Sequence, residues 1–404
     1  MDRVILHCDL NNFFASVELL SHPDLRDIPT AVCGDPTSRH GIILAKNQAA
    51  KALGVQTAET IYQARQKAPG LVLLPPHHRL YHAYSKKINT LYGTYTDLVE
   101  PFGVDESWLD ITGSLHLLGG SGEEVANRIR QQVREEFGLT VSVGVSFNKI
   151  FAKLGSDYRK PDATTVISRD NWQEIVWPLP VQSLLFVGHA AAKVLSRHAI
   201  RTIGQLAACP QELLEQLLGR QGLQLHRYAN GLDNSPVRPQ HCSEPVKSVG
   251  NGTTFSRDLT DWPSIAQALQ VLSDSVAMRL RRQGLYASGV QVTIRDARFQ
   301  TITRQKRLDR PTHLMQELSQ GACDLARRAW KAPTPVRMLA VTALSITEAA
   351  DAYEQLDLLH NAGEEERRDR REKLEQTMDS IRSRFGDDVI AFGKPRRVNP
   401  RDEL

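Results

Sequence analysis

The chain has 404 residues, of which 41% are hydrophobic and 24% are charged, so it can form a folded protein of about two to four domains. Its net charge of +4 is mild, and its five scattered cysteines include no C-x-x-C pair, which argues against a disulfide framework or a zinc site and favours a reducing cytoplasm. No apolar run of about 18 residues occurs, and the first residues lead straight into a strand-like segment, so we expect neither secretion nor a membrane span.

The first 165 residues mix predicted strands and helices. Residues 4–8 predict a short buried strand that ends at Asp9, and residues 141–146 alternate valine with small residues, which predicts a half-buried strand. The other predicted strands are 30–33, 71–74, 98–104 and 107–111, and the predicted helices are 13–20, 81–95, 123–137 and 148–157, with a helix-rich insert over 45–69. Because strands and helices do not alternate regularly, the sequence predicts an α+β fold.

The rest of the chain divides by composition. Residues 166–238 have a helical pattern, and residues 236–245 are polar and contain prolines, which predicts a linker. In residues 246–346, strands are predicted over 290–294 and 338–344 and a helix over 314–330. The charged run over 361–388 predicts one solvent-exposed helix.

Basic residues are concentrated between Lys247 and Arg337, where fifteen Lys or Arg stand against seven Asp or Glu, an excess of eight. The densest part comprises Arg279, Arg281, Arg282, Arg295, Arg298, Arg304, Lys306, Arg307 and Arg310. Such an excess predicts a phosphate-facing surface, although an ordinary solvated face would have the same composition.

Three acids stand at the ends of predicted strands. Asp9 ends one strand, and Asp105 and Glu106 lie between two others. In one sheet these carboxylates can converge, where they repel one another unless a cation neutralises them. Magnesium suits a few carboxylates together with waters and phosphates, and two such ions can catalyse in-line phosphoryl or nucleotidyl transfer. Taken singly, acids at strand ends are more often turn formers or helix caps.

Three segments resemble the motifs of one enzyme family. Residues 9–18 (DLNNFFASVE) resemble the first motif of the Y-family DNA polymerases, and residues 103–112 (GVDESWLDIT) resemble the second. Residues 142–149 (SVGVSFNK), running on to Lys153 and then to 156–161 (SDYRKP), resemble the third. The motifs occur in family order and spacing, the likeness extends from residue 4 to about residue 346, and the bacterial DinB-like branch is the most similar. The resemblance implies a right-hand polymerase with palm, fingers, helical thumb and a C-terminal α/β little-finger domain.

The resemblance also implies roles in catalysis. Asp9 and Asp105 would bind two Mg²⁺ ions with help from the Leu10 carbonyl, and Glu106 would complete the site on the side of the primer 3′-hydroxyl as the catalytic acid. Phe14, beside Phe13 at the nucleotide site, falls on the steric-gate position, where a ring leaves no room for a ribose 2′-hydroxyl. A core aromatic is the alternative interpretation of Phe14, and Phe13 fits that description.

The residues expected to hold the incoming deoxynucleoside triphosphate depart from the family pattern at two positions. Lys160 aligns with the lysine that approaches the triphosphate, which suits its compact charge. Gln48 and Lys51 stand where family members commonly have Tyr and Arg. Because Lys51 keeps the charge but lacks the bidentate fork of arginine, nucleotide affinity or selectivity is expected to differ.

Two segments resemble parts of the family that hold DNA. Residues 186–193 resemble a helix-hairpin-helix turn with Gly188 at its corner, where backbone N–H groups can face a phosphate; Ala190 replaces the second glycine, and an ordinary helical turn is the alternative. Lys247 and Ser248 resemble the entry into the little finger. The arginines of that domain, Arg295 and Arg304 among them, would contact the DNA backbone without reading bases.

A short peptide follows the predicted little finger, and its residues are Gln355, Leu356, Asp357, Leu358 and Leu359. It resembles the peptide by which bacterial polymerases attach to the ring-shaped sliding clamp, with the leucines as apolar anchors. A short helix that packs back on the little finger would show the same spacing. The charged tail after it has no assigned function.

The implied domains are a palm (1–16 and 76–165), fingers (17–75), a thumb (166–238), a linker (239–246), a little finger (247–346) and the clamp peptide with the tail (347–404). The implied function is low-fidelity, template-directed DNA synthesis past damaged bases, carried out by a monomer on primer–template DNA without a proofreading exonuclease. A non-catalytic DNA-binding scaffold is one alternative, but it would typically lose the carboxylates that this chain keeps. A nucleotidyl cyclase is another, but it would leave the basic segment and the clamp-like peptide without a use.

Overall fold

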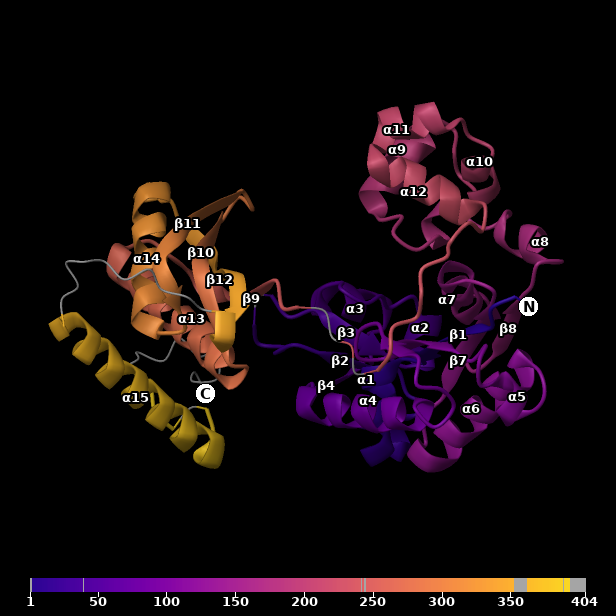
Figure 1. Cartoon of the computed structure of the whole chain (residues 1–404), viewed down its shortest axis with the longest axis horizontal. Helices are drawn as coiled ribbons and strands as arrows, with labels where there is room; N and C mark the ends of the chain where they lie inside the picture. Colours follow the sequence, from indigo (N-terminus) through magenta and orange to yellow (C-terminus); the bar gives the residue numbers. More distant parts are fainter. Residues whose placement is uncertain are drawn as a thin grey trace. The chain divides into compact units, whose positions relative to one another are not determined.

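The computed structural model describes residues 2–38, 40–240, 242, 245–351, 362–387 and 389–392, without the side chains of Ala362 and Glu364. The chain forms two compact units, residues 1–243 and 244–404, and each has its own core (Figure 1). The boundary falls within the predicted linker 239–246. Across the part of the chain that the structure describes, every helix is too short or too polar to cross a membrane.

A five-stranded sheet lies at the centre of the first unit. Its strands, in spatial order, are β5 (Val99–Pro101), β6 (Glu106–Asp110), β1 (Ile5–Leu10), β7 (Val141–Ser146) and β8 (Thr164–Ile167). β1 pairs antiparallel with both β6 and β7. Leu6, Cys8 and Leu10 of β1 pack into a core with α4 (His78–Tyr92) and α6 (Gly122–Phe137). Because side chains alternate along a strand, Ile5, His7 and Asp9 face the other side, where α7 (Lys149–Tyr158) packs.

β7 is buried on both faces, so the predicted half-buried strand is wrong. Its valines join the core with α6, and its small residues lie against α7. Gly144 permits this approach, because a Cβ at this position would lie 1.9 Å from the Ala152 carbonyl oxygen of α7. Close packing against α7 therefore requires the small residues that the sequence suggested were exposed.

A second, three-stranded sheet in this unit has the order β3 (Ile43–Lys46), β2 (Thr30–Cys33) and β4 (Val72–Leu74). It shares a small core with the α2–α3 segment. The helices of this region are α1 (Phe13–Ser21), η1 (Pro23–Leu25), α2 (Gln48–Ala52) and α3 (Ile61–Lys67), whereas α5 (Leu115–Leu118) packs on the core of the five-stranded sheet. The helix-rich insert over 45–69 is confirmed, and β3 is a strand that the sequence did not predict.

The helical prediction for residues 166–238 is confirmed from Trp172 to Ala229, whereas residues 166 and 167 belong to β8. Its elements are α8 (Trp172–Val176), η2 (Val181–Ser183), α9 (His189–Arg197), α10 (Ile203–Ala207), α11 (Gln211–Leu218) and α12 (Arg220–Ala229). These helices share a core with Phe147, Phe151 and Leu154 in and just before α7. The prolines after α12 do not begin a free linker at residue 236. Val237 is 3% exposed and packs with Ile5 and Trp108. The first residues of the predicted linker 236–245 therefore belong to the first unit.

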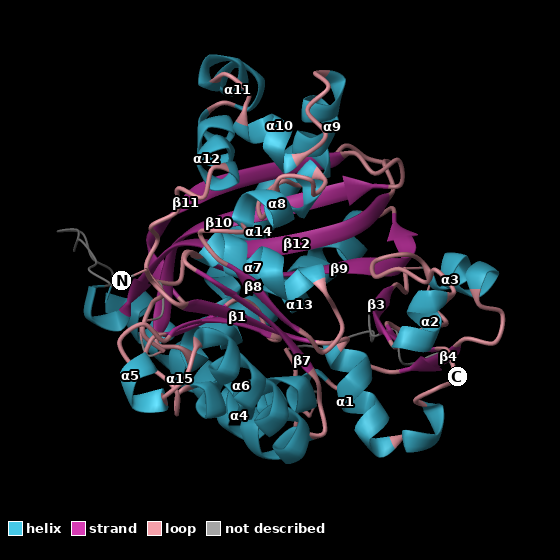
Figure 2. Cartoon of the chain, turned by 90° about the vertical axis from the view of Figure 1, so that its right-hand side faces the viewer, coloured by secondary structure: helices cyan, strands magenta, loops and turns pink. Residues whose placement is uncertain are grey.

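The second unit is a sheet with helices on one face. Its antiparallel strands, in spatial order, are β11 (Thr301–Thr312), β10 (Leu285–Asp296), β12 (Val336–Glu348) and β9 (Ser248–Leu259), followed in sequence by η3 (Ala349–Asp351) (magenta in Figure 2). α13 (Trp262–Arg282) and α14 (Met315–Ala329) form the core with this sheet. β9 and β11 were not predicted as strands, because they lie at the sheet edges, where polar and basic side chains hide the apolar alternation.

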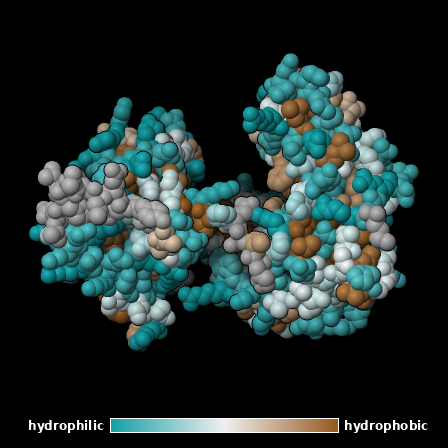
Figure 3. Space-filling model, in the orientation of Figure 1, coloured by the Kyte–Doolittle hydropathy of each residue, from teal (hydrophilic) through white to brown (hydrophobic). Residues whose placement is uncertain are grey.

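The charged run near the C-terminus forms α15 (Ala362–Phe385), so the predicted helix is confirmed, but its predicted exposure is wrong along one face. Glu375, Met378 and Arg382 are buried, and α15 contacts α13 of the same unit (Figure 1). The side of the helix that faces the viewer in Figure 3 is mostly hydrophilic. α15 is therefore an added layer of the second unit.

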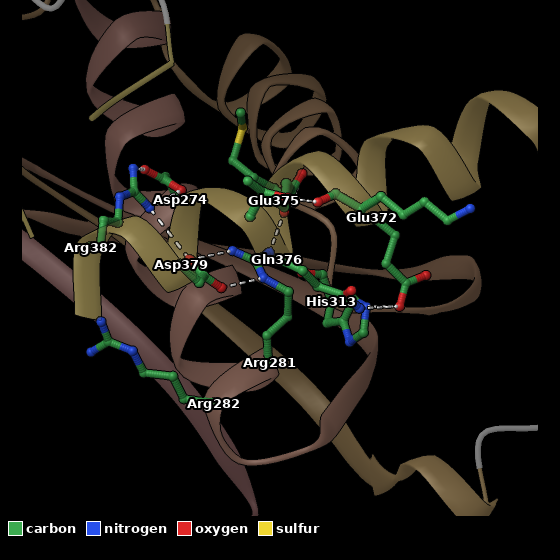
Figure 4. Close-up of polar contacts among 12 residues, drawn as sticks. Asp274, Arg281, Arg282, His313, Glu372, Glu375, Gln376, Asp379 and Arg382 are labelled. Carbon is green, nitrogen blue, oxygen red and sulfur yellow. Dashed lines mark hydrogen bonds and ion pairs between the residues drawn. The ribbon is translucent and has the colours of Figure 1, made fainter. Parts of the chain in front are cut away.

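Paired charges dominate the α15 contact (Figure 4). Arg281 of α13 is bonded to Glu375, and its Nε lies 2.7 Å from Asp379 Oδ2. Arg382 forms two hydrogen bonds with Asp274, at 2.7 and 3.1 Å. Arg281 is 5% exposed, so the prediction that it belongs to a phosphate-facing surface is wrong: burial in this network removes it from the surface.

Candidate active site

The register of β1 and β6 brings two of the predicted acids together. Asp9 is directly opposite Glu106 in this antiparallel pair, so both side chains lie on the same face of the sheet. The Leu10 N–H donates to the Asp105 carbonyl oxygen at 3.0 Å, which joins the end of β1 to the loop that carries Asp105. The strand ends therefore converge as the sequence suggested.

Two lysines of the third motif reach these acids. Lys153 of α7 lies with its Nζ 3.1 Å from Asp9 Oδ2, 2.9 Å from Glu106 Oε2 and 3.3 Å from Asp157 Oδ2. Lys160 Nζ lies 2.6 Å from both Asp9 Oδ2 and Asp157 Oδ1. Burial lowers the pKa of Lys153, but the charges of Asp9, Asp157 and Glu106 outweigh burial and raise it. Both ammonium groups are thus held as cations among the carboxylates.

His7 is a third neighbour of the two paired acids. Its Nε2 lies 3.2 Å from Glu106 Oε2, and its side chain has no exposed surface. His7, Asp9 and Glu106 each offer one ligand atom, and these atoms lie within 4.8 Å of one another. Asp105 does not belong to this group, so the structure unites Asp9 and Glu106 and places the Asp105 carboxylate outside the immediate cluster.

Burial and neighbouring charges shift the pKa values of Asp105 and Glu106 in opposite directions. Burial, together with the charges of Asp9 and Glu106, raises the pKa of Asp105 to about 6. Burial also disfavours ionised Glu106, but the nearby His7 ring and Lys153 ammonium lower its pKa to about 2. The pKa of His7 is lowered, chiefly because the ring is buried. A divalent cation would suit this donor set, since it would relieve the charge that keeps Asp105 hard to ionise.

Phe13 and Phe14 have different environments. Phe13 is 3% exposed and belongs to the core, which agrees with its interpretation as a core aromatic. Phe14 is partly exposed and stacks on Tyr81, with ring centroids 4.1 Å apart and planes at 14°. Tyr81 donates a hydrogen bond to the buried carboxylate of Glu18. The Phe14 ring is therefore held against a fixed partner.

The other predicted binding residues belong to elements that do not carry the acids. Gln48 and Lys51 are exposed on α2, and Gly188 precedes the first turn of α9 with open space around its Cβ position. Lys247 and Ser248 are exposed at the start of the second unit. Residues 355–359, the predicted clamp peptide, lie outside the described residues.

The two arginines predicted to hold DNA are not on one face of the second unit. Arg304 is opposite Val292, whose side chain joins the core with the helices, so Arg304 lies on the helix side of an edge strand. Arg295 alternates with the buried Ile294 and donates to Thr301 Oγ1 at 3.0 Å, on the open side of the sheet. The structure therefore does not bring the two together.

Comparison with known proteins identifies the family of the chain. Residues 8–157 match the impB/mucB/samB family, and residues 246–358 match the C-terminal domain of that family. The chain is 47% identical to a DNA polymerase IV of Acetivibrio thermocellus over 96% of each protein. The chain belongs to the Y-family DNA polymerases.

Further relatives agree with this assignment. A DNA polymerase IV of Clostridium kluyveri is 35% identical over 97% of this chain and 98% of its own length. A solved Y-family DNA polymerase chimera superposes with a TM-score of 0.76 at 25% identity, covering 85% of this chain and 99% of the chimera. The chain is a translesion DNA polymerase with the Y-family fold, so its substrates are template DNA and deoxynucleoside triphosphates, and its family is typically metal-dependent.

Sequence reasoning did not single out His7, Lys153 or Asp157 as site residues, although the last two lie within the third motif. A local signal existed for each. His7 is two residues before Asp9 and so shares its strand face. Lys153 and Asp157 are four residues apart and so share one face of α7.

Proposed function

We propose that Asp9, Asp105 and Glu106 hold two Mg²⁺ ions and that Glu106 lies on the side of the primer 3′-hydroxyl. The observation that carries the proposal is the direct pairing of Asp9 with Glu106 at adjoining strand ends, where the Asp105 carbonyl oxygen accepts from the Leu10 N–H. When bound, two such ions lower the pKa of an attacking hydroxyl and stabilise the leaving oxygen of an in-line displacement. The Leu10 carbonyl is the fourth protein donor in this proposal.

The lysines then have a second role. Lys160 already contacts two carboxylates through Nζ, and an ammonium at that place attracts the triphosphate of an incoming nucleotide. Lys153 joins Asp9 to Glu106 and keeps the two carboxylates from separating. Gln48 and Lys51 complete the nucleotide contacts from α2 in place of a tyrosine and an arginine.

Phe14 acts as the steric gate in this proposal. The stacking on Tyr81 leaves the Phe14 ring little freedom, and a fixed ring excludes a ribose 2′-hydroxyl by its volume. Phe13 supports Phe14 from the core, with their ring centroids 5.8 Å apart.

The proposed macromolecular partners are primer–template DNA and the sliding clamp. Gly188, Lys247, Ser248, Arg295 and Arg304 contact the backbone of primer–template DNA. Residues 355–359 bind the bacterial sliding clamp, and the enzyme acts as a monomer in the cytoplasm. In support of a reducing compartment, all five cysteines, each within the described ranges, are free thiols.

Primer extension tests the catalytic proposal. Wild-type protein with Mg²⁺ and four deoxynucleotides is expected to extend a primer according to the template, and the Asp105→Ala/Glu106→Ala variant to bind the same DNA without extending it. Phe14→Ala is expected to gain incorporation of ribonucleotides that the wild type rejects. A wild-type protein that binds primer–template but extends it with neither Mg²⁺ nor Mn²⁺ would instead indicate the non-catalytic scaffold.

A further inference from the structure

The His7 imidazole is buried beside the proposed metal site, and none of the roles assigned above uses it. It lies on the same face of β1 as Asp9 and is directly opposite Trp108 of β6. The edge of one ring meets the other at a centroid distance of 5.1 Å and an angle of 63°. A buried polar ring is costly unless its nitrogens find hydrogen-bond partners.

Each nitrogen of the ring faces one polar side chain. Nδ1 lies 2.8 Å from Ser156 Oγ of α7, and this hydroxyl lies 2.8 Å from the Lys153 carbonyl oxygen. Nε2 lies 3.2 Å from Glu106 Oε2. Those last two atoms are buried, and neither forms an aligned hydrogen bond within the described ranges. Nε2 therefore lies within hydrogen-bond distance of the carboxylate that the reaction requires, and Lys153 Nζ contacts the same carboxylate oxygen at 2.9 Å.

The neutral ring carries one N–H, and its position can be argued from these neighbours. With the hydrogen on Nδ1, the Nε2 lone pair would face a carboxylate oxygen, so two acceptors would meet. With the hydrogen on Nε2, Glu106 can accept it, and Nδ1 can accept the hydrogen of the Ser156 hydroxyl. The Lys153 carbonyl loses little by this exchange, since it lies inside α7, where carbonyl groups accept from the helix backbone.

We propose that His7 is a positioning residue that orients Glu106 through Nε2–H, with the Ser156 hydroxyl selecting the tautomer. The inference rests on the proposed role of Glu106. A carboxylate restrained at one oxygen presents the other in a defined direction, and such supporting hydrogen bonds typically contribute about 10–100-fold to metal affinity or activity.

Two isosteric variants separate this role from simple packing. In His7→Gln the amide nitrogen reaches about as far as Nε2, whereas in His7→Asn it reaches only as far as Nδ1. We therefore expect His7→Gln to keep most of the extension rate. His7→Asn is expected to lose about 10–100-fold in kcat and in Mn²⁺ affinity, with the KM for deoxynucleotide little changed. Mn²⁺ binding is measured by electron paramagnetic resonance on the full chain without nucleotide, and thermal unfolding shows whether each variant is folded.

A third variant, at Ser156, keeps the test decisive if both replacements of His7 unfold. Ser156→Ala leaves the imidazole in place but removes the group that selects its tautomer, so we expect a smaller loss of kcat and Mn²⁺ affinity than in His7→Asn. Equal Mn²⁺ affinity and kcat in folded His7→Gln and His7→Asn would overturn the proposal, as would a Ser156→Ala enzyme identical to the wild type. If Glu106→Gln itself extended primers normally, the proposed function would fail; if Glu106→Gln were inactive while the His7 and Ser156 variants behaved as wild type, only this inference would fail.

Discussion

The active site and the α15 contact are both built from buried charged side chains, but they balance charge differently. At α15, Glu375 and Asp379 meet Arg281, and Asp274 meets Arg382, so three carboxylates face two guanidinium groups, a net charge of −1. In the active site four carboxylates (Asp9, Asp105, Glu106 and Asp157) share two ammonium groups (Lys153 and Lys160), a net charge of −2 when all six are ionised.

This difference distinguishes two uses of buried charge. Direct pairs between guanidinium and carboxylate groups hold an element in place, and removing one partner leaves the other with less compensating charge. A surplus of carboxylates destabilises the folded chain and favours cation binding, because the cation supplies the missing charge. We therefore expect substitutions at α15 to affect stability and substitutions among the acids to affect catalysis.

The largest expected effect is on catalysis. Glu106→Gln should reduce single-turnover primer extension with Mg²⁺ by about 1,000-fold, since metal stabilisation of transition-state charge is worth several kcal/mol. Its unfolding temperature should fall somewhat, because the variant loses the ion pair with Lys153, so thermal unfolding is measured to show that the variant is folded. The matched control is Glu123→Gln, an exposed residue of α6, which should extend primers at the wild-type rate. If Glu106→Gln kept more than about a tenth of the wild-type rate, the claim that this acid is required for catalysis would be contradicted.

The second effect is on stability. Glu375→Ala should destabilise the second unit by about 3–5 kcal/mol, because it leaves Arg281 buried with one carboxylate fewer. Chemical denaturation measures this loss, and Arg371→Ala on the exposed side of the same helix should change stability by less than about 0.5 kcal/mol. If the two variants were equally stable, α15 would not be held by its charge pairs.

The Asp105 carboxyl group makes the stability of the folded chain depend on pH. The pKa of Asp105 is raised from its ordinary 3.8 to about 6 in the folded chain, so the folded state favours the protonated acid. Stability from this group is present below about pH 4 and is lost as pH rises through about 6. In chelator, Asp105→Asn should therefore be more stable than wild type by about 3 kcal/mol at pH 7, and the difference should vanish near pH 4. Denaturation across this pH range checks the sign, and a variant less stable than wild type at pH 7 would contradict it.

The smallest effect concerns the packing that positions the lysines. Gly144→Ala forces α7 away from β7, because the new Cβ would lie 1.9 Å from the Ala152 carbonyl oxygen. We expect a loss of about 1–3 kcal/mol, together with slower primer extension because Lys153 moves with α7. Gly113→Ala, whose Cβ would meet nothing within 4 Å, serves as the control in both assays. Unchanged stability in Gly144→Ala would show that α7 can shift without cost.

The sequence predicted those parts of the molecule whose signals are local. The strand that ends at Asp9, the helix 123–137 and the helical segment 166–238 all follow from apolar periodicity, and the motif residues identified the acids. The exposure of α15 was mispredicted because the partners of its charges are distant: Arg281 and Asp379 are 98 residues apart. A charge run does not reveal whether its partners are water or the core.

Long-range pairing also explains what the site prediction lacked. The contact between Lys153 and Asp9 spans 144 residues, and the role of His7 depends on β1, β6 and α7 together. β11 was missed because Arg304, Lys306 and Arg307 interrupt its apolar alternation, and an edge strand tolerates them. Such features depend on tertiary contacts that one sequence does not contain.

The most direct test of the central claim is to count the metal ions in the active site. Electron paramagnetic resonance of Mn²⁺ should report two tightly bound ions per chain in a complex with dideoxy-terminated primer–template and the matching deoxynucleotide. Asp9→Asn should lose at least one of them, whereas Glu375→Gln should keep both, since its carboxylate belongs to α15. Two ions retained in Asp9→Asn, or fewer than two in the wild-type complex, would contradict the account that these acids form a two-metal site.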